Sequence, residues 1–303
     1  MIEITDALMN ICGRENVYRD EPMMKHTSFR IGGPADWFVS PETTGALSET
    51  IQFLKAGSVP YFILGNGSNL LVSDDGYRGV VIQIGKNMSD IVVSGTNVRA
   101  EAGALLSTVA SRAAAASLTG MEFAGGIPGS IGGACVMNAG AYGGEMKDIL
   151  TSVIALFEDG SVRKVPCGEL MLGYRSSALM RNGAIVLEAE LSLTEGDIGE
   201  IRATMDDLRE RRVSKQPLDL PSAGSTFKRP EGYFAGKLIM DSGLRGYAVG
   251  GAQVSEKHCG FVVNRGGATA DDVMTLIRHI QKTVLKNFGV ELVPEVRFLG
   301  EFR

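Results

Sequence analysis

The sequence predicts an α+β fold for a chain of 303 residues. Between residues 26 and 195 short strand-like segments outnumber helical ones, which favours an α+β arrangement over a regularly alternating parallel sheet. Two glycine-rich loops interrupt this region, and neither has the context of a Rossmann or P-loop motif. There is no internal repeat and no low-complexity segment.

Composition places the chain among ordinary globular proteins and excludes several function classes. It is 44% hydrophobic and 21% charged, and it is long enough for one large or two modest domains. A net charge of −5 provides no overall basic field, so we expect neither nucleic-acid nor membrane binding. The first residues lack the basic and apolar regions of a signal peptide, and no apolar run approaches the roughly 20 residues that span a bilayer.

Cysteine and histidine usage predicts a cytoplasmic protein without a metal centre. The four cysteines are scattered without a Cys-x-x-Cys spacing, and the chain has only three histidines. Reduced thiols in a cytoplasmic location are the simplest interpretation, and we predict no bound metal.

The first elements predict a small β-α-β unit. A strand is expected at 36–40 and another at 59–64. Between them, Thr43 or Thr44 can cap a helix with a regular apolar face, and Gly57 ends it.

The second strand runs into the first glycine-rich loop, GNGSNL at residues 65–70. This loop resembles the start of a Gly-x-Gly-x-x-Gly fingerprint, but Leu70 occupies the third glycine position. No helical run follows, since 71–73 and 80–84 read as strands. A Rossmann assignment therefore fails, and no P-loop motif is present.

The second glycine-rich loop, residues 125–144, contains eight glycines in twenty residues. Because glycine adds backbone entropy and packs no side chain, we predict that this run is not the interior of a helix or strand. Apolar residues are threaded through it, so it is not a flexible linker either. We expect an ordered loop whose N–H groups approach a ligand, for which pyrophosphate is the usual candidate. A tightly packed structural turn is the alternative.

The remaining elements follow from periodicity and turn signals. A hairpin is expected around Asp159-Gly160, with its strands at 153–157 and 162–165. Further strands are expected at 91–94, 98–102, 184–193 and 260–263. Helices are expected at 105–120, 197–212, 235–242 and 271–288.

Six segments in order resemble the UDP-N-acetylenolpyruvoylglucosamine reductases, the MurB family. They are HTSFRIGGP (26–34), GNGSNL (65–70), the loop 125–144, GYRS (173–176), AGSTFK (223–228) and PEVRF (294–298). The resemblance covers roughly residues 26 to 300. It implies a vanillyl-alcohol-oxidase or PCMH-type two-lobed FAD-binding module followed by an α+β substrate-binding domain.

The resemblance also implies domain limits. We expect a helical lead-in at 1–25 and an FAD-binding domain at 26–195, with lobes at about 26–85 and 86–195. The substrate-binding domain is expected at 196–303.

The family reaction passes a hydride from NADPH to FAD and then to the vinyl methylene carbon of UDP-N-acetyl-3-O-(1-carboxyvinyl)-glucosamine. The product is UDP-N-acetylmuramate, a peptidoglycan precursor. The resemblance therefore implies noncovalent FAD, NADPH as hydride donor and a UDP-sugar substrate. We expect a monomer.

Site residues carry over where this sequence matches the family motifs. Ser225 matches the proton donor, and Arg175 and Glu295 match the two residues that stabilise the intermediate. The expected cofactor-binding residues are Gly65, Asn66, Gly67, Ser68, Asn69, Leu70, Gly103, Gly126, Ile127, Pro128, Ser130, Gly132, Gly133, Asn138 and Gly140. The expected substrate-binding residues are Tyr174, Lys215, Lys228 and His258.

The chemistry explains these residue types. A guanidinium at Arg175 can fork onto the substrate carboxylate with a permanent charge. The Ser225 hydroxyl can protonate a developing carbanion, with Lys228 or a nearby dipole stabilising the alkoxide. An ionised Glu295 would repel the negative charge that develops on the substrate, so we expect it to donate a hydrogen bond as a neutral acid.

Less specific interpretations compete at each position. Without their motifs, Arg175 reads as a surface ion-pair residue and Ser225 as a turn or cap serine. In the basic cluster of Arg209, Arg211, Arg212 and Lys215, we interpret Arg209 and Arg211 as complementing the end of a helix.

Two departures separate this chain from the longer form of the family. The segment between Arg175 and Ser225 is too short to contain that form's substrate-covering tyrosine loop. Arg229 stands where the longer form has asparagine, so the corresponding diphosphate contact stays open.

Two other functions remain as alternatives. One is a flavin oxidoreductase of the same fold that acts on a sugar lactone or a purine. The other is a nucleotide-sugar-binding regulator without catalysis, against which the joint presence of Arg175, Ser225 and Glu295 argues.

Overall fold

The computed structural model describes residues 2–302, which divide into two compact units. The first unit holds the chain up to Tyr18 together with Trp37–Asn66 and Val80–Arg212. The second holds Arg19–Asp36, Gly67–Gly79 and the chain from Val213 onward. Strands β1 (Val17–Pro22), β2 (Pro34–Val39) and β5 (Tyr77–Gln83) each continue from one unit into the other.

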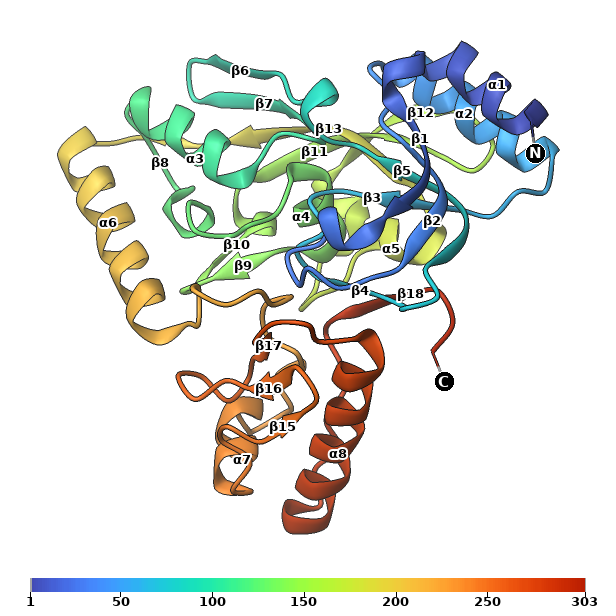
Figure 1. The fold of residues 1–303 in the computed structure, drawn as a ribbon. Helices are drawn as coiled ribbons and strands as arrows, with labels where there is room; N and C mark the ends of the chain where they lie inside the picture. The colour runs from blue at the N-terminus through green and yellow to red at the C-terminus, as the bar shows by residue number, and fades with distance from the viewer. Residues whose placement is uncertain (1, 303) are drawn as a thin grey trace. The chain divides into compact units, whose positions relative to one another are not determined.

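A five-stranded antiparallel sheet forms the larger part of the first unit, in the order β12-β11-β13-β7-β6 (Figure 1). Its strands are β6 (Ile91–Ser94), β7 (Asn97–Glu101), β11 (Leu150–Leu156), β12 (Val162–Pro166) and β13 (Ile185–Ser192). Inward-facing residues such as Val153, Ala189 and Ala100 are fully buried against α3 (Leu106–Ala115) and α4 (Ile131–Met137). In β7, exposed and buried positions alternate, as a strand with one covered face requires.

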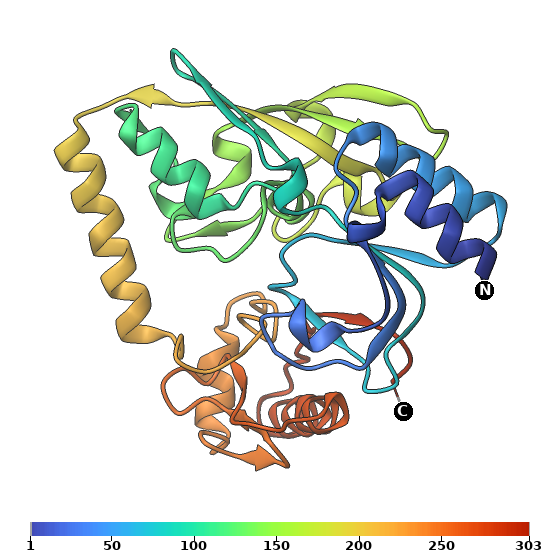
Figure 2. The same ribbon diagram turned by 45° about the horizontal axis from the view of Figure 1, so that its top comes forward.

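The smaller part of the first unit contains α1 (Ile2–Cys12), α2 (Thr44–Ala56) and β3 (Tyr61–Leu64). The two helices lie side by side in both views (Figures 1 and 2). Thr43 caps α2 by accepting a 3.1 Å hydrogen bond from the N–H of Ala46, and Gly57 ends the helix, as predicted. The predicted order of strand, helix and strand is present as β2, α2 and β3, and both strands lie in one sheet. They are not neighbours in it, because β5 lies between them and pairs in parallel with β3.

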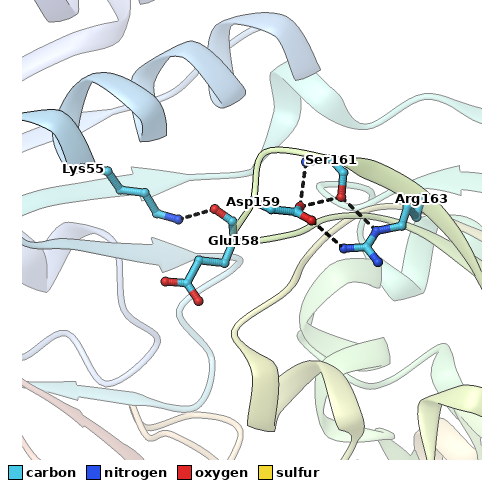
Figure 3. Close-up of polar contacts among 5 residues, drawn as sticks. All are labelled: Lys55, Glu158, Asp159, Ser161 and Arg163. Atoms are coloured by element: carbon cyan, nitrogen blue, oxygen red, sulfur yellow. Dashed lines mark hydrogen bonds and ion pairs between the residues drawn. The ribbon is translucent and has the colours of Figure 1, made fainter.

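The β11–β12 hairpin turns at Asp159-Gly160, as the sequence predicts (Figure 3). The Asp159 carboxylate accepts hydrogen bonds from the N–H of Ser161 and, at 3.1 Å, from Nη2 of Arg163. These bonds hold the pKa of Asp159 below its ordinary value, with the Ser161 hydroxyl making the largest contribution. Lys55 Nζ donates a 2.8 Å hydrogen bond to the carbonyl oxygen of Glu158, which ties α2 to the hairpin.

The second unit packs α7 (Ala235–Asp241) and α8 (Ala270–Phe288) around a three-stranded sheet. Its strands are β15 (Ala248–Val249), β16 (Ala252–Val254) and β17 (Val262–Asn264), and β4 (Leu70–Val72) pairs in parallel with β18 (Arg297–Leu299). Phe29 and Ile31, from the segment at 26–34, lie in the core of this unit. Asp74 accepts hydrogen bonds of 2.8 and 3.0 Å from the first N–H groups of α8, which joins distant parts of the chain.

Shorter elements complete the fold. They are α5 (Ala178–Asn182), α6 (Ile198–Lys215), β8 (Leu118–Thr119), β9 (Gly140–Ala141), β10 (Gly144–Glu145) and β14 (Thr194–Glu195). Among residues 2–302, 3-10 helices lie at Arg14–Asn16, Met23–Lys25, Lys86–Met88, Glu122–Ala124, Met146–Asp148 and Cys167–Leu170. Within the described residues, no helix combines the length and the apolar character that crossing a membrane requires.

Two sequence predictions were wrong. The glycine-rich run at 125–144 contains a helix, α4, with Gly132 and Gly133 inside it. A Cβ at Gly132 would lie 2.9 Å from Cβ of Ala102, so the low helix propensity of glycine is outweighed by close packing against the sheet. In the lead-in expected at 1–25, the α-helix ends at Cys12, and strand β1 follows between two short 3-10 helices.

Candidate active site

Within the first unit, the two glycine-rich segments lie against each other. Asn66 Nδ2 donates a 2.7 Å hydrogen bond to the carbonyl oxygen of Pro128. A Cβ at Gly65 would lie 2.6 Å from the Ser130 hydroxyl oxygen, closer than any side chain tolerates. Glycine is therefore needed at Gly65 because the second segment approaches its backbone closely.

Ser130 and Gly133 form a cradle at the start of α4. The Ser130 side chain is 3% exposed and makes no capping hydrogen bond, although it occupies the N-cap position. Outside the helix's own backbone, a Cβ at Gly133 would contact only the Ser130 oxygen, at 3.7 Å. The Ser130 hydroxyl is therefore not used to cap the helix, and there is space beside Gly133. An anionic group such as the diphosphate of FAD could accept a hydrogen bond from this hydroxyl.

Other predicted cofactor residues hold the loop in place. The N–H groups of Ile131 and Gly132 donate 2.8 Å bonds to the carbonyls of Ala104 and Ala102. At Gly103 a Cβ would lie 2.0 Å from the carbonyl oxygen of Gly85, so only glycine fits. Ile127 is half-buried against the core of the first unit. These contacts all lie within the protein and hold the backbone of the loop in place.

Asn138 is fully buried and ends α4 in the left-handed conformation, with φ 47°. Its Nδ2 donates to Glu145 Oε2 at 2.8 Å and to the carbonyl of Gly173 at 3.2 Å. Its Oδ1 accepts from the N–H of Lys147 at 2.9 Å. Both polar atoms of the Asn138 amide are therefore engaged within the unit.

Arg175 lies at the tip of a tight turn that is joined to the same loop. Gly173 and Ser176 exchange backbone hydrogen bonds of 3.1 and 3.2 Å, and Arg175 has φ 52° between them. Arg175 Nη2 donates to the carbonyl of Gly140 at 3.3 Å, and the guanidinium lies 5.3 Å from the ring centre of the exposed Tyr174. The turn thus presents a cation beside the glycine-rich loop.

The second unit brings Ser225 and Glu295 together. The N–H of Glu295 donates a 2.8 Å hydrogen bond to the carbonyl of Thr226, the residue after Ser225. Phe227 forms an isolated β-bridge with Pro294, which continues this pairing. Thr226 is fixed from its other side, because its N–H donates to the carbonyl of Gly260 at 2.8 Å. The predicted proton donor and the predicted carboxyl group therefore stand on neighbouring segments.

The residues after Asn66 belong to this second unit. Asn69 Nδ2 donates to the carbonyl of Glu295 at 3.1 Å, and the carbonyl of Asn69 accepts from the N–H of Arg297 at 2.9 Å. Leu70 follows as the first residue of β4 and is buried, and Ser68 is half-buried. At Gly67 a Cβ would lie 1.9 Å from the carbonyl oxygen of His26, so glycine is required there.

His258 lies in the same unit, two residues before Gly260, whose carbonyl accepts the N–H of Thr226. Its Nδ1 accepts a 3.1 Å hydrogen bond from the N–H of Gly260, so the ring proton of the neutral form sits on Nε2. The ring packs edge-on against Phe261, with 5.0 Å between ring centres. Burial lowers the pKa of His258 below its ordinary value. The structure therefore holds a neutral imidazole there.

Cationic side chains lie on both sides of the Ser225 segment in the sequence. Lys228 is half-buried, and its N–H donates to the carbonyl of Val293 at 2.9 Å. Arg229 donates from Nε to the carbonyl of Tyr233 at 3.3 Å and lies 4.0 Å from the ring centre of Phe234. Lys215 is the exposed last residue of α6.

Two residues of the first unit were not assigned a role from the sequence. Arg212 lies against the glycine-rich loop, because a Cβ at Gly126 would come within 3.1 Å of its Cδ. Burial lowers the pKa of Arg212. By contrast, Arg211 forms an exposed ion pair with Asp207 one helical turn earlier, with 2.8 Å between Nη2 and Oδ2. Arg211 and Arg212 differ in which side of α6 they occupy. The run of basic residues in the sequence does not show which of them faces the loop.

Glu145 is the other unassigned residue. It accepts the hydrogen bond from Asn138 and pairs with Lys147, which raises the pKa of that lysine. Locally, Glu145 forms a capping box with Asp148 at the 3-10 helix Met146–Asp148, but no local motif indicates its bond to Asn138, seven residues earlier. Among the described residues, no group of three or more His, Cys, Asp or Glu side chains is placed to hold a metal ion.

Comparison with known proteins identifies the families that the two parts of the chain match. Residues 35–166 match the family described as FAD binding domain. Residues 216–299 match the C-terminal domain of UDP-N-acetylenolpyruvoylglucosamine reductase. The predicted fold class and the predicted FAD cofactor are thereby confirmed.

Full-length relatives agree as well. The UDP-N-acetylenolpyruvoylglucosamine reductase of Agathobacter rectalis is 57% identical over 296 residues, which cover 94% of each chain. That of Clostridioides difficile is 52% identical over 294 residues, or 97% of each chain. The crystal structure of the enzyme (MurB) from Thermus caldophilus superposes with a TM-score of 0.81 at 37% identity and covers 94% of this chain and 99% of that one. The chain therefore belongs to the UDP-N-acetylenolpyruvoylglucosamine reductase family, MurB.

Proposed function

We propose that this chain reduces UDP-N-acetyl-3-O-(1-carboxyvinyl)-glucosamine to UDP-N-acetylmuramate with NADPH, through bound FAD. Membership of the reductase family makes it a flavoprotein oxidoreductase of peptidoglycan precursor synthesis. The observation that carries the proposal is the 2.8 Å hydrogen bond between Glu295 N–H and the carbonyl of Thr226. This bond places the segment that carries the Ser225 hydroxyl beside the segment that carries the Glu295 carboxyl group. A site in which these two groups act on one substrate requires such an arrangement.

FAD fits the first unit, where the Ser130 hydroxyl, Gly133 and the backbone around Gly65 would hold its diphosphate. When bound, FAD supplies the hydride chemistry that protein side chains lack. The predicted residues Asn66, Gly126 and Pro128 line the same segments, all exposed. A binding surface made of backbone and a hydroxyl provides donors without a competing negative charge.

Each proposed catalytic residue acts on a different part of the substrate. Arg175 would hold the substrate carboxylate with its guanidinium and balance the charge that develops there. Ser225 would give its hydroxyl proton to the carbon next to that carboxylate, with Lys228 stabilising the oxygen left behind. Glu295 would donate a hydrogen bond as a neutral acid, because a second negative charge would oppose the reaction.

The remaining polar groups of the second unit suit the UDP-sugar. We propose that Lys215, Lys228 and Arg229 contact the diphosphate, since ammonium and guanidinium groups bind phosphate oxygens strongly. Arg229 then takes the place of the asparagine of the longer form. The neutral His258 would offer its Nε2–H to an acceptor on the substrate. From the first unit, we propose that the exposed Tyr174, next to Arg175, contacts the substrate.

A spectroscopic titration tests the proposed function. Purified protein should show a flavin spectrum that NADPH bleaches under anaerobic conditions, and the UDP-enolpyruvyl sugar should restore it with one equivalent per flavin. Bleaching without reoxidation by this sugar would overturn the proposal and favour a flavin enzyme acting on another substrate. Protein that binds the sugar but never reduces it would favour a regulator.

Several proposals rest on the sequence and await their own tests. We propose the division into a lead-in at 1–25, an FAD-binding domain at 26–195 and a substrate-binding domain at 196–303. We also propose that the protein is a monomer and that it works in the cytoplasm. Light scattering at several concentrations tests the first of these two proposals, and fractionation of cells tests the second.

A further inference from the structure

The Asn138 side chain connects the glycine-rich loop to the turn that carries Arg175. Asn138 is fully buried, and its Nδ2 donates to the carbonyl of Gly173 at 3.2 Å. That carbonyl also accepts the N–H of Ser176 at 3.2 Å, so both of its lone pairs are used. The bond from Asn138 therefore fixes the first residue of the turn.

Two more hydrogen bonds join the same pair of segments. Ser177 donates from its hydroxyl to the carbonyl of Val136 at 2.7 Å. Arg175 donates from Nη2 to the carbonyl of Gly140 at 3.3 Å. Hydrogen bonds of Asn138, Arg175 and Ser177 thus attach residues 173–177 to residues 136–140, and Asn138 lies midway along the loop segment.

The orientation of the Asn138 amide is also determined. Its Oδ1 accepts from the N–H of Lys147 at 2.9 Å, so its NH₂ group must face Glu145 and Gly173. Glu145 accepts the second NH₂ proton at 2.8 Å and is itself paired with Lys147. Both NH₂ protons and the carbonyl oxygen of the amide therefore have protein partners, and no donor remains for a cofactor.

We propose that Asn138 is a positioning residue for Arg175 and not a ligand of FAD, with Glu145 holding the Asn138 amide in place. This inference rests on the proposed function, in which Arg175 binds the substrate carboxylate. Arg175 adopts φ 52°, a conformation that costs free energy for a residue with a Cβ and persists only where its surroundings impose it. The Asn138 bond to Gly173 supplies part of that constraint.

A double-mutant cycle with Arg175 tests the proposal. Asn138→Gly removes the amide and tolerates the left-handed backbone of this position. Ser58→Gly is the matched control, because Ser58 is exposed and has φ 52° just after the end of α2. Each variant is made alone and with Arg175→Ala. The readouts are the FAD dissociation constant, the rate of flavin reduction by NADPH and the rate of reoxidation by the enolpyruvyl substrate.

The proposal predicts a specific pattern. Asn138→Gly should slow reoxidation roughly 10- to 100-fold, the range that loss of orientation produces. It should leave FAD affinity and flavin reduction within about threefold of the parent protein. In the Arg175→Ala background it should slow reoxidation no further, because its effect passes through Arg175. The Ser58→Gly control should change none of the three readouts.

Other outcomes overturn the proposal. Multiplicative effects of Asn138→Gly and Arg175→Ala on reoxidation would show independent roles, and a weakened FAD affinity would show that Asn138 supports the cofactor. If Asn138→Gly does not fold, Glu145→Ala should give the same dependence on Arg175, while Glu145→Gln, which keeps the acceptor, should restore the rate. Normal reoxidation in Arg175→Ala alone would instead refute the proposed role of Arg175.

Discussion

The carbonyl oxygen of Thr226 accepts a 2.8 Å hydrogen bond from the N–H of Glu295, which joins two segments about seventy residues apart in the sequence. The side chains of Ser225 and Glu295 are not needed for this bond, because it runs between main-chain atoms. Substitutions at either side chain therefore change the chemistry of the site while the backbone pairing stays in place.

Glu295→Gln should retain reoxidation by the enolpyruvyl substrate within about tenfold of the parent rate, because an amide can donate the hydrogen bond expected of a neutral acid. Glu295→Ala removes the donor and should slow the same step roughly 10²- to 10³-fold. Stopped-flow absorbance of the reduced flavin measures both rates. Equal losses in the two variants would show that the proton or the charge of the carboxyl group is needed.

Gly133→Ala should separate cofactor binding from folding. The free protein has room for the methyl group, whose only contact outside the helix backbone is Ser130 at 3.7 Å, so its stability should stay equal or rise by about 0.5–1 kcal/mol. FAD should bind about tenfold more weakly, because the methyl group occupies the cradle. Thermal unfolding of flavin-free protein and fluorescence titration with FAD measure the two effects.

Gly103→Ala is the contrasting control for that experiment. A Cβ there would lie 2.0 Å from the backbone oxygen of Gly85, so this variant should lose stability with or without flavin. An unchanged FAD affinity in Gly133→Ala would place the diphosphate away from the start of α4.

His258→Gln should flatten the dependence of stability on pH. Burial lowers the pKa of His258 from its ordinary 6.5, so the folded protein keeps the ring neutral at pH values where the unfolded chain takes up a proton. The contribution of His258 is therefore complete above pH 6.5 and is lost as the pH falls from there toward the folded pKa. Glutamine keeps an acceptor for Gly260 N–H and does not titrate.

Urea unfolding at about pH 5.5 and pH 7.5 measures this effect. The midpoint of the parent protein should fall more between the two pH values than the midpoint of His258→Gln. The same fall in both proteins would mean that other groups, and not His258, set the pH dependence in this range.

Local signals predicted most of the regular fold. The helix at Ala270–Phe288 agrees with its predicted limits within one residue, because Val273, Ile277, Ile280 and Val284 repeat on one face, and all four are buried. The hairpin around Asp159-Gly160 likewise follows from its turn residues. Both elements are determined by local features of the sequence, namely the spacing of apolar residues and the identity of the turn residues.

Elements determined by distant partners were not predicted. Helix α4 forms although it contains two glycines, since Gly132 lets it pack against Ala102. The hydrogen bond from Asn138 to Gly173 joins residues 35 positions apart, and no local sequence pattern predicts it. The sequence motifs predicted Arg175, Ser225 and Glu295 as catalytic residues. The structure adds the backbone hydrogen bonds that hold the segment of each residue in place.

The proton-donating role of Ser225 is the central claim, and the two half-reactions of Ser225→Ala test it most directly. Ser111→Ala, which changes an exposed serine on α3, is the matched control. We expect NADPH to bleach the flavin of Ser225→Ala at the parent rate, while reoxidation by the enolpyruvyl substrate falls roughly 10²- to 10⁴-fold. Reoxidation at the parent rate, or an equal loss in both half-reactions, would contradict the account.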